Sequence, residues 1–147
     1  LGDVYKRQDI NYIVTLKGIA SKSNINVKGA LQDKAKKSFK GTLDFKQGAS
    51  KSVGAEDEYC MLLSKDAKAK AMPVLLCSED DVSGEHSASS GKIDESKLFY
   101  LMSRGLTYED SKIVIVRAAF NPIIDAIDDE NTINEILEKL NRGLKNE

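Results

Sequence analysis

Apolar and polar residues alternate along most of the chain, from about residue 10 to residue 90. A period of two is typical of β-strands with one buried face. Turn-prone clusters at residues 21–24, 46–48 and 78–81 separate the alternating runs. The sequence therefore predicts an array of short strands over residues 9–92. Its alternating apolar sets are Tyr12/Val14/Leu16, Ile25/Val27, Leu43/Phe45, Tyr59/Met61/Leu63 and Val74/Leu76.

A short repeat runs through this region. An apolar residue followed by Lys-Gly occurs at Leu16, Val27 and Phe39, so the spacings are 11 and 12 residues. Strands at this spacing suit either a sandwich or a stacked β-solenoid. The repeat, the modest size of the apolar residues and an aromatic content of 6% without Trp favour the solenoid. Three matches can arise by chance, so the residues alone leave both folds open.

The hydrophobic period changes after Gly91, where Leu98, Leu101 and Met102 fall on one face of a helix. We expect three to four helices over residues 93–147, which would cap the end of a solenoid. The expected boundaries are an N-cap at Asp94, a stop at Gly105, a capping box at Thr107, a break and new start at Asn121-Pro122, and a last helix from Thr132 to about Gly143.

Composition narrows the class of protein. The 147 residues are 41% hydrophobic, and 22 basic residues against 23 acidic ones argue against nucleic-acid binding. No apolar run approaches the roughly 18–20 residues of a membrane span. Two cysteines are too few for a disulfide framework, so we expect a reducing, cytoplasmic setting. Residues 1–8 fit poorly with the alternating pattern that begins near Ile10, which suggests a non-native scar on a chain truncated at its N-terminus.

Few residues could carry chemistry. Phosphate-binding loops and common catalytic motifs are absent from the sequence, so we expect no ATP hydrolysis. Residues 80–88 hold the single histidine, His86, directly after Glu85, and both are competent iron ligands. A lone His beside Glu is more often a turn residue. A thiolate from Cys60 or Cys77 would be the better cluster ligand, but for both we favour the interpretation of a small buried hydrophobic residue.

An ordered string of residues resembles a known family. It comprises Met72-Pro73-Val74-Leu75, Asp81-Val82, Glu85-His86-x-Ala88, Gly91-Lys92-Ile93 and Leu98-Phe99-Tyr100-Leu101-x-Ser103-Arg104-Gly105. This string is similar to the C-terminal signature of the SufB/SufD family of SUF-system iron–sulfur cluster assembly scaffolds, and the similarity extends over about residues 20–127. The resemblance implies a right-handed parallel β-helix followed by a small C-terminal helical domain.

The resemblance also implies a function. Family members are non-catalytic scaffold subunits that pair through their β-helices, and the helical domains dock a SufC-type ATPase. The partner implied for this chain is a SufB/SufD-type subunit, either a distinct SufB or a second copy of the chain itself. A transient iron–sulfur cluster forms at the pairing interface from iron and from sulfur delivered through the complex. Some complexes are suggested to use a flavin reductant, for which this sequence offers no support. No nucleic acid or membrane is implied as a partner.

Individual residues follow from the same resemblance. His86 matches the SufD histidine at the interface, with Glu85 beside it, so His86 is the candidate iron and cluster ligand. The essential cysteine of SufB falls at Glu58, two residues before Cys60, which leaves Cys60 as a substitute thiol in a chain that looks SufD-like. Phe99, Tyr100 and Arg104 are candidates for ATPase docking, although Phe99 and Tyr100 are more often helix core.

Two other functions stay open. The chain could be a structural adaptor that never contacts the cluster, since the SufB cysteine has no clear match. It could also be a solenoid acyltransferase with His86 as general base, although the hexapeptide repeat of such enzymes is missing.

Overall fold

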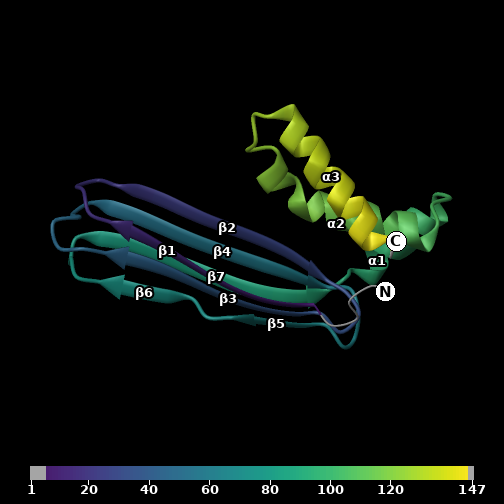
Figure 1. Ribbon diagram of the computed structural model, residues 1–147, viewed down its shortest axis with the longest axis horizontal. Coiled ribbons are helices and arrows are strands. Elements are labelled where there is room, and N and C mark those ends of the chain that lie inside the picture. Colours follow the sequence, from purple (N-terminus) through teal and green to yellow (C-terminus); the bar gives the residue numbers. More distant parts are fainter. Residues whose placement is uncertain (1–5, 146–147) are drawn as a thin grey trace. The chain divides into compact units, whose positions relative to one another are not determined.

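The computed structural model describes residues 6–145 of the chain. Within them, strands come first and helices follow (Figure 1). The strands are β1 (Arg7–Leu16), β2 (Lys22–Leu31), β3 (Lys36–Phe45), β4 (Ser52–Leu62), β5 (Lys68–Ala71), β6 (Val74–Cys77) and β7 (Val82–Lys92). The helices are α1 (Glu95–Ser103), α2 (Tyr108–Ile124) and α3 (Glu130–Leu144).

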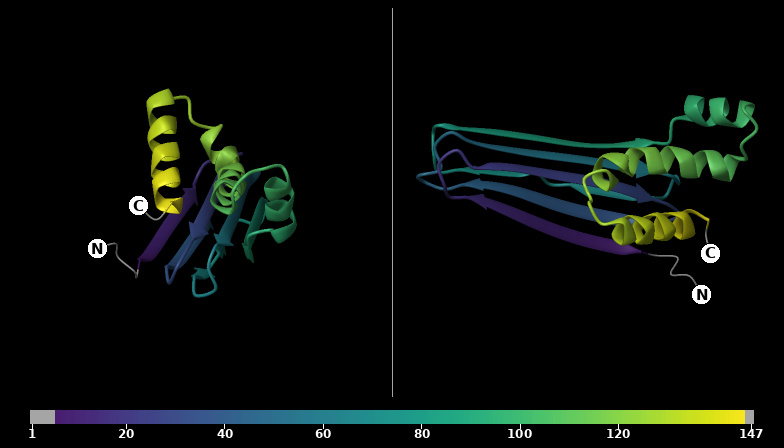
Figure 2. Two further views of the ribbon diagram at one scale, coloured as in Figure 1. Left: turned by 90° about the vertical axis from the view of Figure 1, so that its right-hand side faces the viewer. Right: turned by 90° about the horizontal axis from the view of Figure 1, so that it is seen from above.

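Successive strands alternate between two sheets. One sheet holds β1, β3, β5 and β6, in which β5 and β6 each pair with β3. The other sheet has the order β2-β4-β7. The pairs β1/β3, β2/β4, β3/β5 and β3/β6 are all parallel. Figure 2 shows the strands end-on and from above. A chain that alternates between two parallel sheets winds as a coil, which confirms the predicted class: mainly parallel β-structure in a β-helix-like arrangement, followed by a helical part.

One full turn of the coil takes about 30 residues. Arg7 pairs with Lys36 and Lys22 with Val53, which are offsets of 29 and 31 residues. The Lys-Gly repeat at 11 and 12 residues is therefore not the interval at which strands of one sheet stack. A coil contains two strands of about ten residues and two corners, so a periodic signal from single strands is shorter than the repeat that stacks.

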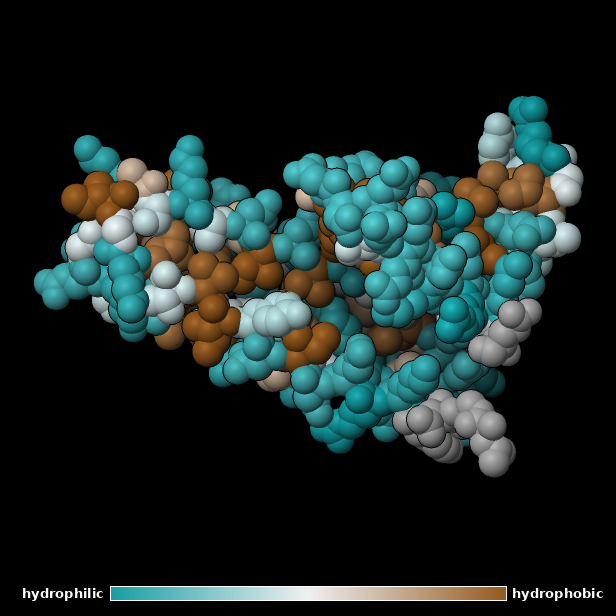
Figure 3. Space-filling view, turned by 45° about the horizontal axis from the view of Figure 1, so that its top comes forward, coloured by the Kyte–Doolittle hydropathy of each residue, from teal (hydrophilic) through white to brown (hydrophobic). Residues whose placement is uncertain are grey.

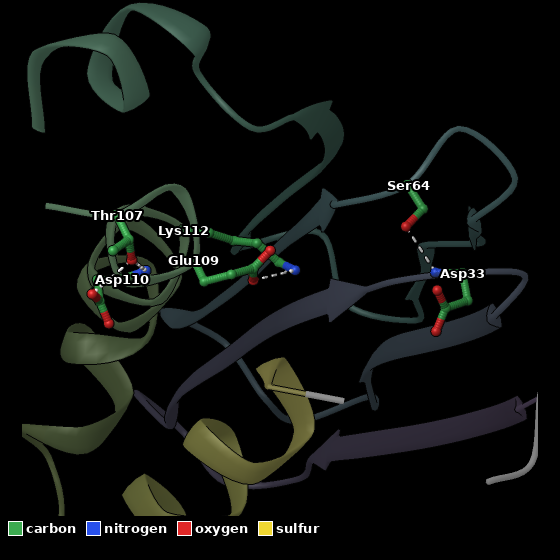
Figure 4. A network of polar contacts seen from close by, with 6 residues as sticks. All are labelled: Asp33, Ser64, Thr107, Glu109, Asp110 and Lys112. Carbon is green, nitrogen blue, oxygen red and sulfur yellow. Dashed lines mark hydrogen bonds and ion pairs between the residues drawn. The ribbon is translucent and has the colours of Figure 1, made fainter. Parts of the chain in front are cut away.

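The corners of the coil stack on one another. The Ala20 N–H donates to the Ser50 carbonyl at 2.8 Å, and the Lys51 N–H donates to the Asp81 carbonyl at 2.6 Å. A second corner is joined by a side chain, since the Asp33 N–H donates to Ser64 Oγ at 2.8 Å (Figure 4). Ala20, Asp33 and Lys51 adopt positive φ, which lets the chain turn sharply between sheets.

The apolar core of the coil pairs large side chains with very small ones. Phe45 is fully buried in the first sheet, and glycines of the facing sheet make room for it. A Cβ added at Gly54 would lie 2.9 Å from Phe45 Cζ, and one added at Gly84 would lie 2.7 Å from Leu75 Cδ1. Packing of this kind tolerates little change in volume. The core cluster comprises Leu16, Ile25, Phe39, Leu43, Phe45 and Ala49.

The outer surface of the coil is mixed in polarity. Figure 3 shows apolar surface, in brown, scattered between hydrophilic side chains over the strands. Large apolar side chains exposed on the coil include Tyr12, Ile13, Ile19 and Val53. Apolar atoms contribute a large share of any protein surface, so these residues need no special role in the fold.

Capping residues set the helix starts. Asp94 caps α1 by accepting from the Ser96 and Lys97 N–H groups, as predicted, and Gly105 at φ 96° follows its end. Thr107 caps α2: its Oγ1 accepts from the Asp110 N–H at 3.1 Å and donates to the Asp110 carboxylate at 2.7 Å (Figure 4). The predicted helix start at Thr107 is confirmed, and the Asp110 carboxylate contacts the Thr107 hydroxyl.

Two predicted helix boundaries were wrong. Pro122 does not start a new segment, because α2 continues through it to Ile124. Proline lacks an N–H and clashes with the preceding turn, but here only two helical residues follow it, so the cost stays local. The last helix begins at Glu130 rather than at Thr132, since Asp129 is the N-cap and accepts from the Thr132 N–H.

The chain divides into two compact units, residues 1–91 and 92–147. Arg7 and Gln8 belong to β1 and pair with Lys36 and Lys37, whereas the rest of the suspected scar lies largely outside the described residues. Among residues 6–145, no helix is both long enough and apolar enough to cross a bilayer.

Candidate functional site

The inward face of β4 carries polar groups where a coil normally holds apolar ones. Alternate residues of this strand are buried, namely Ser52, Gly54, Glu56, Glu58 and Cys60. The set Tyr59, Met61 and Leu63, predicted as the apolar alternation of this strand, lies on the opposite face. Two carboxylates and a thiol therefore stand in a row inside the coil.

Glu58 is neutralised by a buried lysine. Lys37 on β3 donates from Nζ to Glu58 Oε1 at 2.6 Å, and the two side chains are 4% and 2% exposed. The ammonium group also lies 5.3 Å from the centre of the Phe39 ring. A buried ion pair contributes little net stability because both charges lose water, but removing one partner leaves an uncompensated charge. Glu58 Oε2 has no hydrogen-bond partner in the described part of the chain.

Cys60 is buried as predicted, with 1% of its surface exposed. Gly29 leaves room for the sulfur, since a Cβ added there would lie 3.1 Å from Cys60 Sγ. Burial raises the pKa of the Cys60 thiol, and the Lys37 charge only partly opposes this effect. The group is therefore a protonated thiol near neutral pH, which is a weak ligand and a weak nucleophile.

Cys77 differs from the prediction. It is exposed at the end of β6, whereas we expected a small buried hydrophobic residue. The reason is its place in the stack: β6 pairs with β3 on one side, and no other described strand covers its second edge.

Glu56 has no hydrogen-bond partner among residues 6–145. The residue is 3% exposed, and both carboxylate oxygens are unsatisfied within that range. Burial raises the pKa of the Glu56 carboxyl, the His86 charge lowers it, and the Glu58 charge raises it further. Gly41 on β3 makes space for this side chain, because a Cβ added there would lie 2.3 Å from the carboxyl carbon of Glu56.

A small cavity opens beside the polar row. Its volume is about 80 Å³, enough for water molecules. Its walls are Glu58 and Cys60 from β4, Ala69 and Ala71 from β5, and Ala88, Ser89 and Ser90 from β7. The predominance of Ala and Ser explains why this part of the coil is not filled.

His86 and Glu85 lie on β7, the outermost strand of the second sheet, and both are exposed. Neighbouring residues of a strand point to opposite faces, so these two side chains diverge rather than form a joint ligand pair. His86 shares the inward face with Gly84, whose Cβ position meets Leu75 and Phe45. No group of three or more His, Cys, Asp or Glu side chains suited to a metal ion occurs within residues 6–145.

The docking candidates lie in the helical unit. Phe99 is 75% exposed, so the expectation that it belongs to the helix core was wrong, and Tyr100 is exposed too. Leu98 is the buried residue of α1. The Arg104 guanidinium lies 5.3 Å from the centre of the Tyr100 ring, a cation–π contact at the surface.

Sequence reasoning missed Lys37, Gly41 and Glu56, and it mentioned Glu58 only as a position equivalent to a cysteine. A usable signal was the phase of the strands. Lys37 and Gly41 fall in step with Phe39, Leu43 and Phe45, and the two glutamates fall in step with Cys60. A charged residue in the apolar phase of a strand is a candidate for a buried polar site.

Comparison with known proteins supports the resemblance. Residues 1–119 match the sequence model of the family described as "SUF system FeS cluster assembly, SufBD core domain". The iron–sulfur cluster assembly protein SufD of Bacillus subtilis is 32% identical over 128 residues, which cover 87% of this chain and 29% of that protein. SufD of Escherichia coli is 31% identical over 117 residues, 80% of this chain and 28% of that protein.

A third relative is an iron–sulfur cluster assembly SufBD family protein of Pyrococcus horikoshii, 38% identical over 79 residues, 54% of this chain and 18% of that protein. The chain thus spans less than a third of the length of these curated relatives. The family match covers most of the chain, and the two sheets and the following helices agree with it. The chain belongs to the SufB/SufD family of the SUF iron–sulfur cluster assembly system, with a SufD-like segment.

Proposed function

We propose that this chain is part of a non-catalytic scaffold subunit on which iron and sulfur are assembled into a cluster in the cytoplasm. The observation that carries the proposal is the match of residues 1–119 to the SufBD core, together with two SufD relatives above 30% identity. Iron and sulfur are the cargo of such a subunit, and its own residues serve to bind and orient them.

His86 is the residue that we propose to contact the nascent cluster. Three properties support it: the side chain is exposed, it lies on the outermost strand of its sheet, and its imidazole is a good iron ligand. Because β7 has an open edge among the described strands, a SufB/SufD-type partner subunit placed there could supply the remaining ligands. Glu85 points to the other face and would assist only at a distance.

We assign the thiolate of the cluster site to the partner subunit. Cys60 is buried and its raised pKa keeps it protonated, so it would need both exposure and deprotonation before it could bind iron. The sulfur would reach the site through the complex. This division of labour fits a SufD-like subunit.

The helical unit is the proposed docking region for a SufC-type ATPase. Phe99 and Tyr100 expose aromatic surface beside Arg104, and aromatic residues and Arg are enriched where partners bind tightly. The ATPase would supply the energy for rearrangement, since this chain has no phosphate-binding loop in its sequence.

Copurification tests the complex. The full-length subunit that carries this sequence is coexpressed with a tagged SufC-type ATPase and a SufB-type partner, and retained subunits are measured by gel densitometry. We expect stoichiometric retention for the wild type and a loss of at least about tenfold for Phe99→Ala combined with Tyr100→Ala. Ile19→Ala, an exposed apolar residue of the strand unit, is the control. A folded wild-type subunit that never retains the ATPase refutes the proposed function.

A further inference from the structure

We propose that Glu56 is the positioning residue for His86: its carboxylate accepts a hydrogen bond from one imidazole nitrogen and directs the other nitrogen outward toward the ligand. That the ligand is an iron ion or a nascent cluster rests on the proposed function. The pairing of Glu56 with His86 does not, because it follows from strand register, burial and space in the coil.

The register places the two residues side by side. The Ser87 hydroxyl on β7 donates to Asp57 Oδ1 on β4, and β7 lies next to β4 in the sheet. Position 87 is thus beside position 57, and the preceding positions 86 and 56 are neighbours on the opposite face. That face is the inward one, because Glu56 is buried and Gly84, two residues before His86, faces the apolar core.

The carboxylate of Glu56 needs a donor. Both of its oxygens are buried and unpartnered within residues 6–145, although a buried carboxylate without a partner is strongly unfavourable. The neighbouring inward glutamate, Glu58, has its ion pair with Lys37. Glu56 is therefore an inward carboxylate that still lacks a hydrogen-bond donor, and the adjacent imidazole can donate an N–H.

The coil keeps a space for this side chain. Gly41 faces Glu56 from β3, and a Cβ at that position would overlap the carboxylate. Among charged groups, His86 has the largest effect on the pKa of the Glu56 carboxyl, which it lowers. Glu58 on the same strand has the next largest effect and raises this pKa. Histidines that bind metals usually donate their second N–H to a carboxylate or carbonyl, which selects the tautomer and orients the ring.

The test is simple to read because the chain contains one histidine. The full-length subunit is labelled with ¹⁵N-histidine, and the two nitrogen shifts of His86 are measured at a pH where the ring is neutral. Four proteins are compared: wild type, Glu56→Met, Glu56→Gln and Asp57→Asn. Asp57 is the matched control, since it is the next residue on β4, faces the other way and also neighbours β7.

We expect one tautomer of the wild type to dominate by about tenfold or more, because a charge-assisted hydrogen bond outweighs the intrinsic preference. Glu56→Met should return the tautomer ratio to that of a free imidazole, Glu56→Gln should reduce the preference severalfold, and Asp57→Asn should leave it unchanged. Glu56→Met replaces a buried carboxylate by an apolar side chain of similar length, so we expect this variant to fold; if it does not, the Glu56→Gln ratio decides. Identical ratios in wild type and in the folded Glu56 variants overturn the inference.

The link to iron is measured separately. Binding of Fe²⁺ alone, under anaerobic conditions, should weaken about 10- to 100-fold in Glu56→Met within the assembled complex. If His86→Ala binds Fe²⁺ as tightly as the wild type, the proposed function of His86 fails, while a tautomer shift in the Glu56 variants would still uphold the pairing. If His86→Ala loses binding but Glu56→Met shifts neither the tautomer nor the affinity, only the pairing is refuted.

Discussion

The buried pair of Lys37 and Glu58 offers the sharpest test of how the coil interior is built. Lys37→Met keeps most of the side-chain volume but removes the ammonium group that lies 2.6 Å from Glu58 Oε1. Because Glu58 is 2% exposed, its carboxylate would be left without compensation. Breaking a buried pair in this way costs about 3–5 kcal/mol. The whole free energy of unfolding of a protein domain is about 5–15 kcal/mol, so this loss of stability is large.

The double variant distinguishes this cause from lost packing. Lys37→Met together with Glu58→Met removes both charges and should recover most of the loss, to within about 1 kcal/mol of the wild type or better. Lys46→Met is the control. Lys46 also pairs with a carboxylate, Asp44 at 2.8 Å, but its side chain is half exposed, so we expect a cost below about 1 kcal/mol.

Urea denaturation followed by far-ultraviolet circular dichroism measures these differences on the full chain. With a slope near 2 kcal/mol per molar, the single variant should lower the midpoint by about 2 M. A Lys37→Met midpoint as close to the wild type as that of Lys46→Met would show that water or another group compensates Glu58. A double variant as unstable as the single one would assign the loss to packing instead of charge.

Three further outcomes follow from the same row of side chains. Gly41→Ala should cost about 1–3 kcal/mol in urea denaturation because its Cβ displaces the Glu56 carboxylate, and Glu56→Ala in that background should relieve the cost; additivity of the two changes would contradict the contact. The raised pKa of Glu56 means that the folded chain binds its proton more tightly, so the free energy of unfolding should fall as pH rises above the ordinary value of 4.5; Glu56→Gln should remove this fall, and an unchanged slope would contradict it. Iodoacetamide should alkylate exposed Cys77 in the native protein at least about tenfold faster than buried Cys60, as read by mass spectrometry, and equal rates would contradict the burial of Cys60.

The sequence predicted the class of fold because its local signals agree with the global arrangement. Alternation marked the strand region, and the caps at Asp94 and Thr107 marked two helix starts. The coil period was missed, because residues that stack lie about 30 positions apart, far beyond the range of the local alternation that marks single strands. The helix break predicted at Pro122 was wrong, because only two helical residues follow the proline and its cost stays local.

The candidate site was predicted less completely, for a physical reason. Exposed His86 could be found from its residue type and its setting, but Glu56 and Glu58 look like ordinary surface residues in the sequence. Their burial depends on Lys37 from another strand and on the space left by Gly41. Such compensation is three-dimensional, and only the register of β3, β4 and β7 reveals it. Charged residues that are buried in the apolar phase of a strand are therefore candidates for functional residues.

In the proposed function, the outermost strand of the coil presents His86 to a growing iron–sulfur cluster. Anaerobic reconstitution of the assembled complex with iron and sulfide, read by the visible absorbance of the cluster, tests this role most directly. We predict that His86→Ala, with unchanged circular dichroism and subunit retention, forms at least about tenfold less cluster than the wild type. Equal cluster yield from the wild type and the folded His86→Ala complex would contradict the role of His86.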